Sequence, residues 1–244
     1  MNKIHNRVQK PLSIVDGVVI IIGVFILING LIGSGLFPLE QLAGWLPGGA
    51  TVINRLLVMQ GLQVALMLGL TALFLFGVRH GTLEQIGLRP FAKKGWIVRS
   101  SLLGVGMFFA MMLVSVLMSM LFPQWAQPQD ISTVILKAEN AWEWIAVIVV
   151  VSVFAPLSEE ILFRGYIYHS LREKYSVIYS IIAASLLFGC MHYDLFRLLP
   201  LTLGGIALNV VSVRADSLWA SIIMHGVWNF MNTLVLLLTA GLVT

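Results

Sequence analysis

The chain has 244 residues, of which 59% are hydrophobic and only 11% are charged, and its mean hydropathy is +0.93. Soluble domains carry about 25% charged residues, so this composition excludes an ordinary soluble protein and predicts an integral membrane protein. The net charge of +4 is typical of basic cytoplasmic loops between membrane spans and does not indicate nucleic-acid binding.

Hydrophobic runs follow one another along the chain, and most are long enough to cross a bilayer core of about 30 Å. The predicted spans are 17–39, 56–78, the run between Arg99 and Phe122, a fourth from Trp142 into Glu159 and Glu160, then 175–193, 198–213 and 217–244. The first run is too long for a signal peptide and is expected to be a retained span. With no internal repeat or linker, the pattern predicts one all-α domain over residues 1–244, with a motif-bearing core at about 142–235. This domain is a polytopic bundle of about seven transmembrane helices, or eight if a half-helix is hidden, with its polar site inside.

Basic residues are unevenly distributed around these spans. If the spans alternate in direction, the N-terminal tail, 79–99, 164–174 and residue 214 share one side, with 12 of the 15 Lys and Arg residues. The other side has only Arg55, Lys137 and Arg197. The positive-inside rule therefore predicts a multi-pass protein of the plasma membrane with a cytoplasmic N-terminus and an external C-terminus.

A group of charges lies where the fourth run ends, at Glu159, Glu160 and Arg164. Charges at such a depth are costly and usually face a cavity or a partner, so they indicate function. On a helix Glu160 and Arg164 are four residues apart and are predicted to form an ion pair, which alone is more often a structural clamp. Glu159 is rotated by about 100° from Glu160, so its carboxylate stays available. Pro156, just before this group, removes a backbone donor and predicts a kink.

Two further polar motifs lie in later runs. His192 lies near the end of the run 175–193, and His225 and Asn229 share one helix face of the last run. Taken singly, each could be a helix–helix hydrogen bond, because polar groups in a bilayer need partners. Their coincidence with Glu159 predicts that all four side chains line one cavity. Residue counting places His192 nearer the external end than Glu159. Convergence therefore requires the fifth span to begin lower, to tilt, or to include part of 166–174 as an interfacial helix.

The residue types in this set suit the hydrolysis of an amide. Glu159 could take a proton from water, while His192 orients that water or shares the proton. His225 and Asn229 could donate hydrogen bonds to the oxyanion of a tetrahedral intermediate. Alternatively, Glu159, His192 and His225 could hold Zn²⁺ in an open catalytic site, whereas the single cysteine, Cys190, excludes a cysteine-rich one. Both arrangements stay open at this stage, and we favour the one led by the carboxylate.

The three motifs resemble those of the CPBP family, the CaaX-protease and bacteriocin-processing proteins also called the Abi family. The family pattern is a double glutamate with an arginine four residues after the second, then Phe-x-x-x-His, then His-x-x-x-Asn or Asp. Here the pattern reads Glu159-Glu160 with Arg164, Phe188 to His192, and His225 to Asn229. All three motifs are intact and in order, within residues 155–229.

The resemblance implies an intramembrane endopeptidase related to the Ras-converting CaaX protease. In that reading Glu159 and His192 activate water, and His225 and Asn229 stabilise the oxyanion or contribute to a metal site. The family is often described as metalloproteases, while a metal-free glutamate mechanism is proposed for its eukaryotic branch. The resemblance also implies a peptide or lipid-modified peptide as substrate, membrane lipid as the surroundings, and a role in bacteriocin maturation, self-immunity or other processing.

Two other classes of function stay open. A non-catalytic immunity or scaffold protein could keep these motifs for packing, and a small transporter could use Glu159 and His192 as a proton relay. The sequence lacks the internal repeats that are typical of transporters. It also lacks the motifs of zinc-helix, serine and aspartyl intramembrane proteases. A peptidase of the CPBP type is therefore the favoured interpretation.

Overall fold

The structure is a computed structural model that describes residues 9–125 and 130–243, and within these ranges every regular element is a helix. Lys3 and Arg7 of the N-terminal tail, which contribute to the predicted orientation, lie outside the described residues. The helices in chain order are α1 (Ile14–Gly33), α2 (Leu39–Gly44), α3 (Val52–Ala72), η1 (Leu73–Val78), α4 (Trp96–Leu121), η2 (Pro123–Trp125), α5 (Asp130–Ile135), α6 (Ala141–Val149), η3 (Val150–Phe154), α7 (Ala155–Glu160), η4 (Ile161–Ile167), α8 (Tyr168–Arg172), α9 (Val177–Cys190), α10 (Leu195–Ala215) and α11 (Leu218–Val243).

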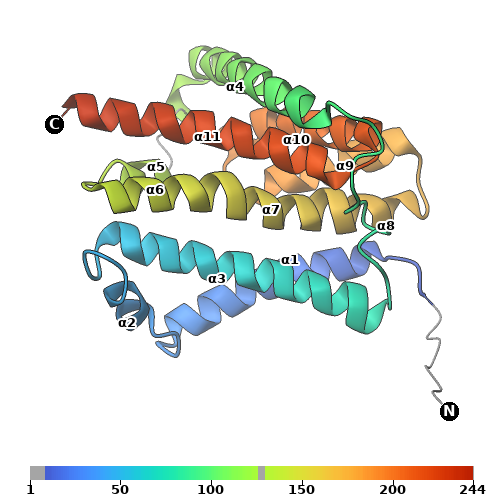
Figure 1. Cartoon of the computed structure of the whole chain (residues 1–244), viewed down its shortest axis with the longest axis horizontal. Coiled ribbons are helices and arrows are strands. Elements are labelled where there is room, and N and C mark those ends of the chain that lie inside the picture. The colour runs from blue at the N-terminus through green and yellow to red at the C-terminus, as the bar shows by residue number, and fades with distance from the viewer. Residues whose placement is uncertain (1–8, 126–129, 244) are drawn as a thin grey trace.

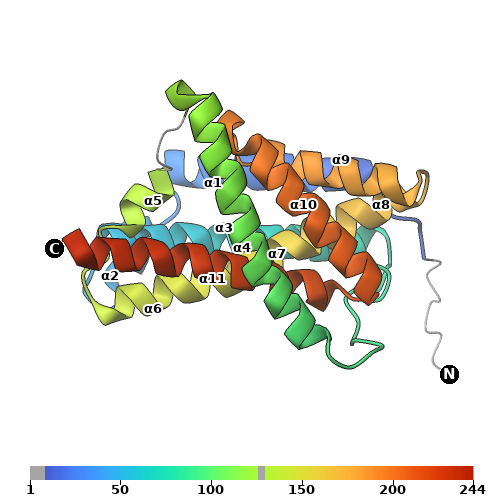
Figure 2. The ribbon, with the colours of Figure 1, turned by 90° about the horizontal axis from the view of Figure 1, so that it is seen from above.

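A central rod organises the bundle. The elements from α6 to α8 form one continuous helical run, Ala141–Arg172, which lies between α11 on one side and α3 on the other (Figure 1). Helix α1 packs along α3, and α4 crosses α11 at a steep angle (Figure 2). Helices α9 and α10 lie side by side and close the remaining side of the rod. The rod therefore touches both halves of the chain.

The predicted all-helical membrane bundle is confirmed in its coarse form. Six helical runs are long and apolar enough to cross a membrane, namely Ile14–Gly33, Val52–Val78, Trp96–Leu121, Ala141–Arg172, Leu195–Ala215 and Leu218–Thr239. The predicted span 175–193 is the 14-residue helix α9. At about 1.5 Å per residue it is roughly 21 Å long, short of a bilayer core of about 30 Å. Within the described residues, six helices therefore qualify as spans by length and composition, and the expected seventh and eighth are not shown.

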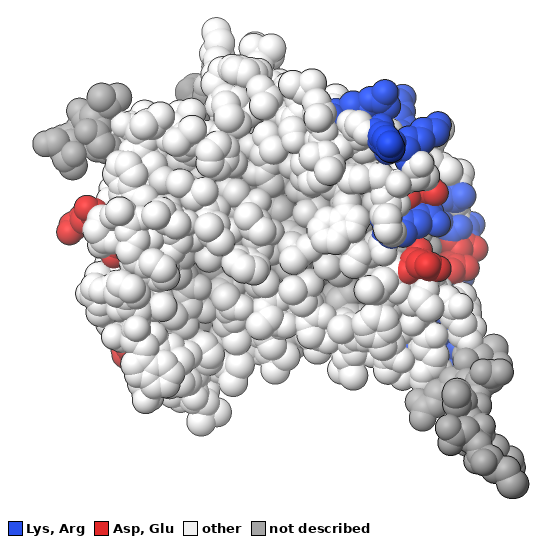
Figure 3. Space-filling model, viewed as in Figure 1, with Lys and Arg blue, Asp and Glu red and all other residues white. Residues whose placement is uncertain are grey.

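On the visible face of the bundle, charged residues collect at the two ends and are absent from the middle. Figure 3 shows Lys and Arg gathered at one end of the visible face, the end at which α8 finishes and α9 begins in Figure 1. The middle of this face is free of charged residues, as a lipid-facing surface requires. This asymmetry agrees with the sequence pattern behind the predicted orientation. Which end faces the cytoplasm stays a prediction.

A buried ionic cluster joins α1 to the central rod at this basic end. Arg79 Nη2 donates to Asp16 Oδ1 over 2.8 Å, and the Tyr166 hydroxyl donates to Asp16 Oδ2 over 2.7 Å. The hydrogen bond to the Asp16 carboxylate raises the pKa of Arg79, so the arginine stays charged. Asp16 comes just before the uncharged part of the first span, and the sequence gives no indication of these distant partners.

Candidate active site

The rod that carries Glu159 has a well-defined start. Asn140 caps α6, because its Oδ1 accepts a hydrogen bond from the Glu143 backbone N–H over 3.0 Å. The buried Glu143 carboxylate in turn accepts from the Glu139 N–H and from the Thr51 hydroxyl on α3, the latter over 2.7 Å. These bonds satisfy the free N–H groups at the helix start and fix α6 against α3.

At Pro156 the helix continues through a π-helical turn, η3, instead of ending. Proline has no N–H, so backbone carbonyls of the preceding turn lose their usual partner. Helix α11 meets them: Asn229 Nδ2 donates to the Val151 carbonyl over 3.0 Å. Gly226 passes so close that a Cβ there would lie 2.6 Å from the Ser152 carbonyl oxygen. The predicted kink therefore takes the form of a π turn on which α11 docks.

The predicted pair between Glu160 and Arg164 is present and completely buried. Arg164 Nη1 donates to Glu160 Oε1 over 2.8 Å, and neither side chain is exposed to solvent. The guanidinium also lies over the Phe188 ring, 4.2 Å from its centre. The sequence did not predict that Glu160 Oε1 also bonds His225 Nδ1, again over 2.8 Å. Glu160 therefore connects the rod to α11.

Glu159 lies in a different environment from its neighbour. Its side chain keeps 18% of its surface exposed and lines a cavity, whereas the Glu160 side chain is fully enclosed. Glu159 Oε2 lies 3.8 Å from His225 Nε2, which is too long for a direct hydrogen bond. The two carboxylates thus face opposite nitrogens of one imidazole ring.

His192 lies in the turn after α9, where its Nδ1 contacts the Phe188 carbonyl oxygen at 2.9 Å. With Nδ1 engaged, Nε2 is left for the cavity. The Phe188 ring packs against both histidines, with ring centres 4.8 Å from His192 and 5.9 Å from His225. One aromatic side chain therefore sets the positions of both imidazoles.

The length of the rod explains how Glu159 and His192 come to lie at the same depth in the bundle. Because the rod continues to Arg172, Glu159 lies 13 residues before its end, and His192 lies 15 residues after the start of α9 at Val177. Both are thus roughly 20 Å from the same turn. The fifth helix does not need to begin lower, because the fourth one ends later than expected.

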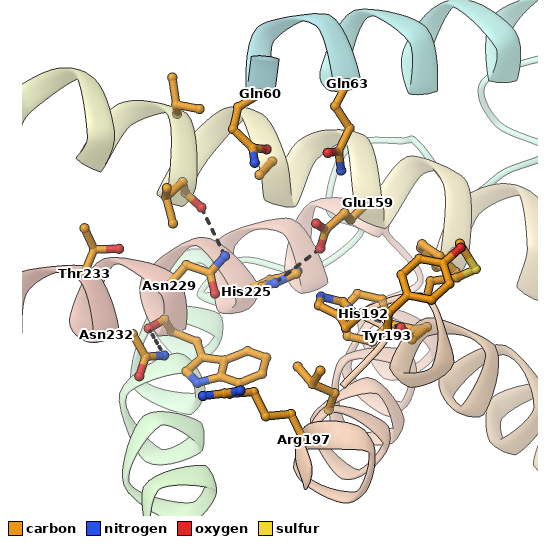
Figure 4. A pocket seen from close by; sticks show the side chains of 18 of the residues that line it. Gln60, Gln63, Glu159, His192, Tyr193, Arg197, His225, Asn229, Asn232 and Thr233 are labelled. Atoms are coloured by element: carbon orange, nitrogen blue, oxygen red, sulfur yellow. Dashed lines mark hydrogen bonds and ion pairs between the residues drawn. The ribbon is translucent and has the colours of Figure 1, made fainter. Parts of the chain in front are cut away.

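All four predicted site residues, Glu159, His192, His225 and Asn229, line one cavity of about 740 Å³ (Figure 4). Sequence reasoning did not assign the other polar lining residues to the site; these are Gln60, Gln63, Ser115, Ser132, Tyr193, Arg197, Asn232 and Thr233. Isolated glutamines inside an uncharged span could have signalled the α3 wall, because lipid offers amides no partner.

The proposed zinc ligands do not form a metal site in this arrangement. Within the residues that the structure describes, no three His, Cys, Asp or Glu side chains lie close enough together to hold a metal ion. His225 does show the second-sphere pattern of a ligand, since Glu160 holds its Nδ1. Of the proposed ligands, Glu159 Oε2 and His225 Nε2 lie 3.8 Å apart, and the zinc alternative stays a prediction.

Comparisons with known proteins agree with the motif reading. Residues 141–231 match the family model described as "Type II CAAX prenyl endopeptidase Rce1-like". The chain is 34% identical over 91 residues to "Putative membrane peptidase YdiL" of Bacillus subtilis (strain 168). That alignment spans 37% of this chain and only 36% of the relative. No solved structure gives a significant match. The resemblance inferred from the three motifs is thereby confirmed for the motif-bearing part of the chain.

Proposed function

We propose that this chain, whose residues 141–231 are of the Rce1-like CAAX endopeptidase type, is an intramembrane endopeptidase. Its substrate is a peptide or lipid-modified peptide that reaches the cavity from the membrane, and the attacking water is activated by Glu159 with His192. One observation carries the proposal: Glu159, the only acidic residue among the described residues that line the cavity, lies beside an imidazole whose Nδ1 bonds the buried Glu160.

Glu159 is suited to the role of general base. Its carboxylate borders the cavity while the adjacent Glu160 carries the structural contacts, so Glu159 is free to accept a proton from water. His192, with its Nδ1 held by a backbone carbonyl, presents Nε2 to hold the same water or to share its proton.

The partner of His225 decides what the ring can donate. Glu160 can only accept when ionised, so His225 Nδ1 carries the proton of that bond. In the neutral ring Nε2 is then an acceptor, and it becomes a donor when the ring gains a second proton. With both nitrogens protonated, Nε2 can donate a hydrogen bond to an oxyanion beside Glu159.

Asn229 contributes a fixed amide on the same face of α11. One N–H is bound to the Val151 carbonyl, and the other stays available for the oxyanion. Because the first bond holds the amide plane, the second donor is preorganised and does not have to be ordered during the reaction.

The test compares the wild-type protein with Glu159→Gln on CaaX-type and leader-bearing peptides in detergent or vesicles. Loss of a general base is expected to lower kcat by about 10²–10⁴-fold. Glu139→Gln is the matched control, because Glu139 does not line the cavity. Cleavage by Glu159→Gln at the wild-type rate would refute Glu159 as the base, and no cleavage of any peptide by the wild type would favour the scaffold class.

A further inference from the structure

We propose that Gln60 and Gln63 on α3 form a binding site for the main chain of an extended, uncharged peptide segment next to Glu159. The site deepens the proposed function and rests on it, since it would hold the substrate on either side of the bond to be cut. Nothing in the three catalytic motifs involves α3.

Both glutamines face the cavity and not the lipid. They line the same cavity as Glu159, and Figure 4 shows both side chains pointing from α3 into the space beside that carboxylate. They are three residues apart, and therefore on one face of the helix. The wall that faces the reactive carboxylate thus carries two primary amides.

Neither amide has a protein partner that would explain its presence as helix packing. Within the described residues Gln60 makes no side-chain hydrogen bond, and Gln63 makes only a long contact, 4.0 Å, to the Met67 sulfur. Asn54 on the same helix offers the contrast, because it is fully buried and donates to the Pro47 and Gly49 carbonyls. The amide of Asn54 therefore has protein partners, as a structural amide does. The amides of the two glutamines are available to a ligand that enters the cavity.

The spacing of the pair suits a peptide main chain. Each amide offers two donors and one acceptor, which matches the N–H and C=O groups of a peptide. Three residues of helix rise by about 4.5 Å, and one residue of extended chain by about 3.3 Å, so the pair can bond groups of neighbouring residues. In lipid, an extended peptide has no other source of partners for these groups.

The remaining lining indicates that the bound segment is uncharged. Histidines apart, the described residues of the lining include two charged side chains, Glu159 and Arg197, and Arg197 is paired with Asp194. Much of the lining is apolar, and it includes the flexible side chains of Met67, Met111, Met112 and Met191. Methionines adapt to side chains of different shape. Recognition would therefore come from the main chain more than from any one side chain.

The test measures peptide binding and cleavage together. The probe is a labelled peptide of alanine, valine and leucine with a lysine at each end, together with ester analogues that replace one backbone N–H at a time with oxygen. Binding is measured on the Glu159→Gln protein, which keeps the cavity, with Gln60→Leu and Gln63→Leu added singly and together. Asn29→Leu is the matched control, because Asn29 lies in a span, outside the cavity, and bonds its own helix.

Each glutamine substitution is expected to weaken binding roughly three- to tenfold, the loss of one hydrogen bond. In the active protein the same substitutions raise KM more than they lower kcat. One ester analogue should bind the parent protein less tightly than the amide peptide, and this difference should vanish in the corresponding glutamine variant. Asn29→Leu should leave all of these values unchanged.

The two proposals fail in different ways. Unchanged binding in the double glutamine variant, or no binding of any probe, overturns the main-chain site. If the glutamine variants cleave with unchanged KM while Glu159→Gln is inactive, the main-chain site is wrong and the peptidase stands. If probes bind in a glutamine-dependent way and the wild-type protein cleaves none of them, the site stands and the peptidase proposal is wrong.

Discussion

At the scale of single residues, two adjacent glutamates have different environments because their side chains point in different directions. Glu160 is enclosed and shared between Arg164 and His225, at 2.8 Å from each. Glu159 borders the cavity and bonds neither. Glu159 is therefore left facing the cavity, because Glu160 forms the ion pair with the buried arginine.

Glu160→Gln is expected to lower the free energy of unfolding by about 3–5 kcal/mol, because it leaves the buried Arg164 charge without its partner. The double variant Glu160→Gln/Arg164→Met removes both charges and should recover most of that loss. Thermal unfolding in detergent checks the order of stability. A double variant that is no more stable than the single one would show that the pair is not what stabilises this region.

The helical repeat alone predicts the contact between Glu160 and Arg164, because both residues lie on one helix. It does not predict the contact between Glu160 and His225, which joins two helices 65 residues apart in sequence. Motif order indicated that Glu159 and His225 belong to one site, but the nitrogen that each carboxylate faces depends on helix packing. The roles of these residues in catalysis stay predictions.

At the scale of elements, the docking of α11 on η3 positions two site residues at once. His225 and Asn229 lie on either side of Gly226, whose Cα packs against the Ser152 carbonyl. Only glycine permits this approach, because any side chain would begin with a Cβ inside the contact distance of the carbonyl. The distance between these two elements therefore sets how far the imidazole reaches toward Glu159.

Gly226→Ala is expected to push α11 away from η3 and to lower peptide cleavage at least tenfold, while the protein stays folded. Gly106→Ala on α4 is the control, because a Cβ there meets nothing within 4 Å. That control should be neutral or slightly stabilising, since alanine favours a helix by up to about 1 kcal/mol over glycine. Equal activity in the two variants, measured by initial rates, would contradict the role of this contact.

Hydrophobic length predicted six of the helical runs, although their ends differ by several residues. The predicted helix ends were wrong where tertiary contacts, and not hydrophobic composition, determine where a helix ends. The fourth run was expected to kink at Pro156 and to end near Glu160, but it continues to Arg172 through the π-helical segments η3 and η4. Helix α2 lies almost entirely between the first two predicted spans and was not predicted, although its Glu40 binds Arg55 of α3 over 2.8 Å. Such tertiary contacts leave no periodic signal in the sequence.

At the scale of the whole molecule, the uneven distribution of Lys and Arg predicts orientation. Lys93 lies in the basic loop before α4, and Lys137 lies in the loop before α6, on the predicted opposite side. The buried cluster of Asp16, Arg79 and Tyr166 lies at the basic end and ties α1 to the rod there. The side of the membrane that holds this basic end therefore determines the orientation of the entire bundle.

A membrane-impermeant maleimide tests this orientation in intact cells. In a Cys190→Ser background, which removes the one native cysteine, we expect Lys137→Cys to be labelled from outside and Lys93→Cys only after the cells are opened. The two variants control for each other's expression and reactivity. Labelling in the reverse order would invert the predicted topology.

The shortness of α9 bears on how a hydrolase in a bilayer obtains its second reactant. A helix of 14 residues ends about 9 Å short of a full hydrocarbon core. The turn that follows carries His192, the highly exposed Tyr193 and the ion pair of Asp194 with Arg197. Lipid next to so short a segment must thin, or yield to hydration of that polar turn. Water on that side of the membrane is thereby brought close to His192, whose imidazole would pass a water molecule to Glu159.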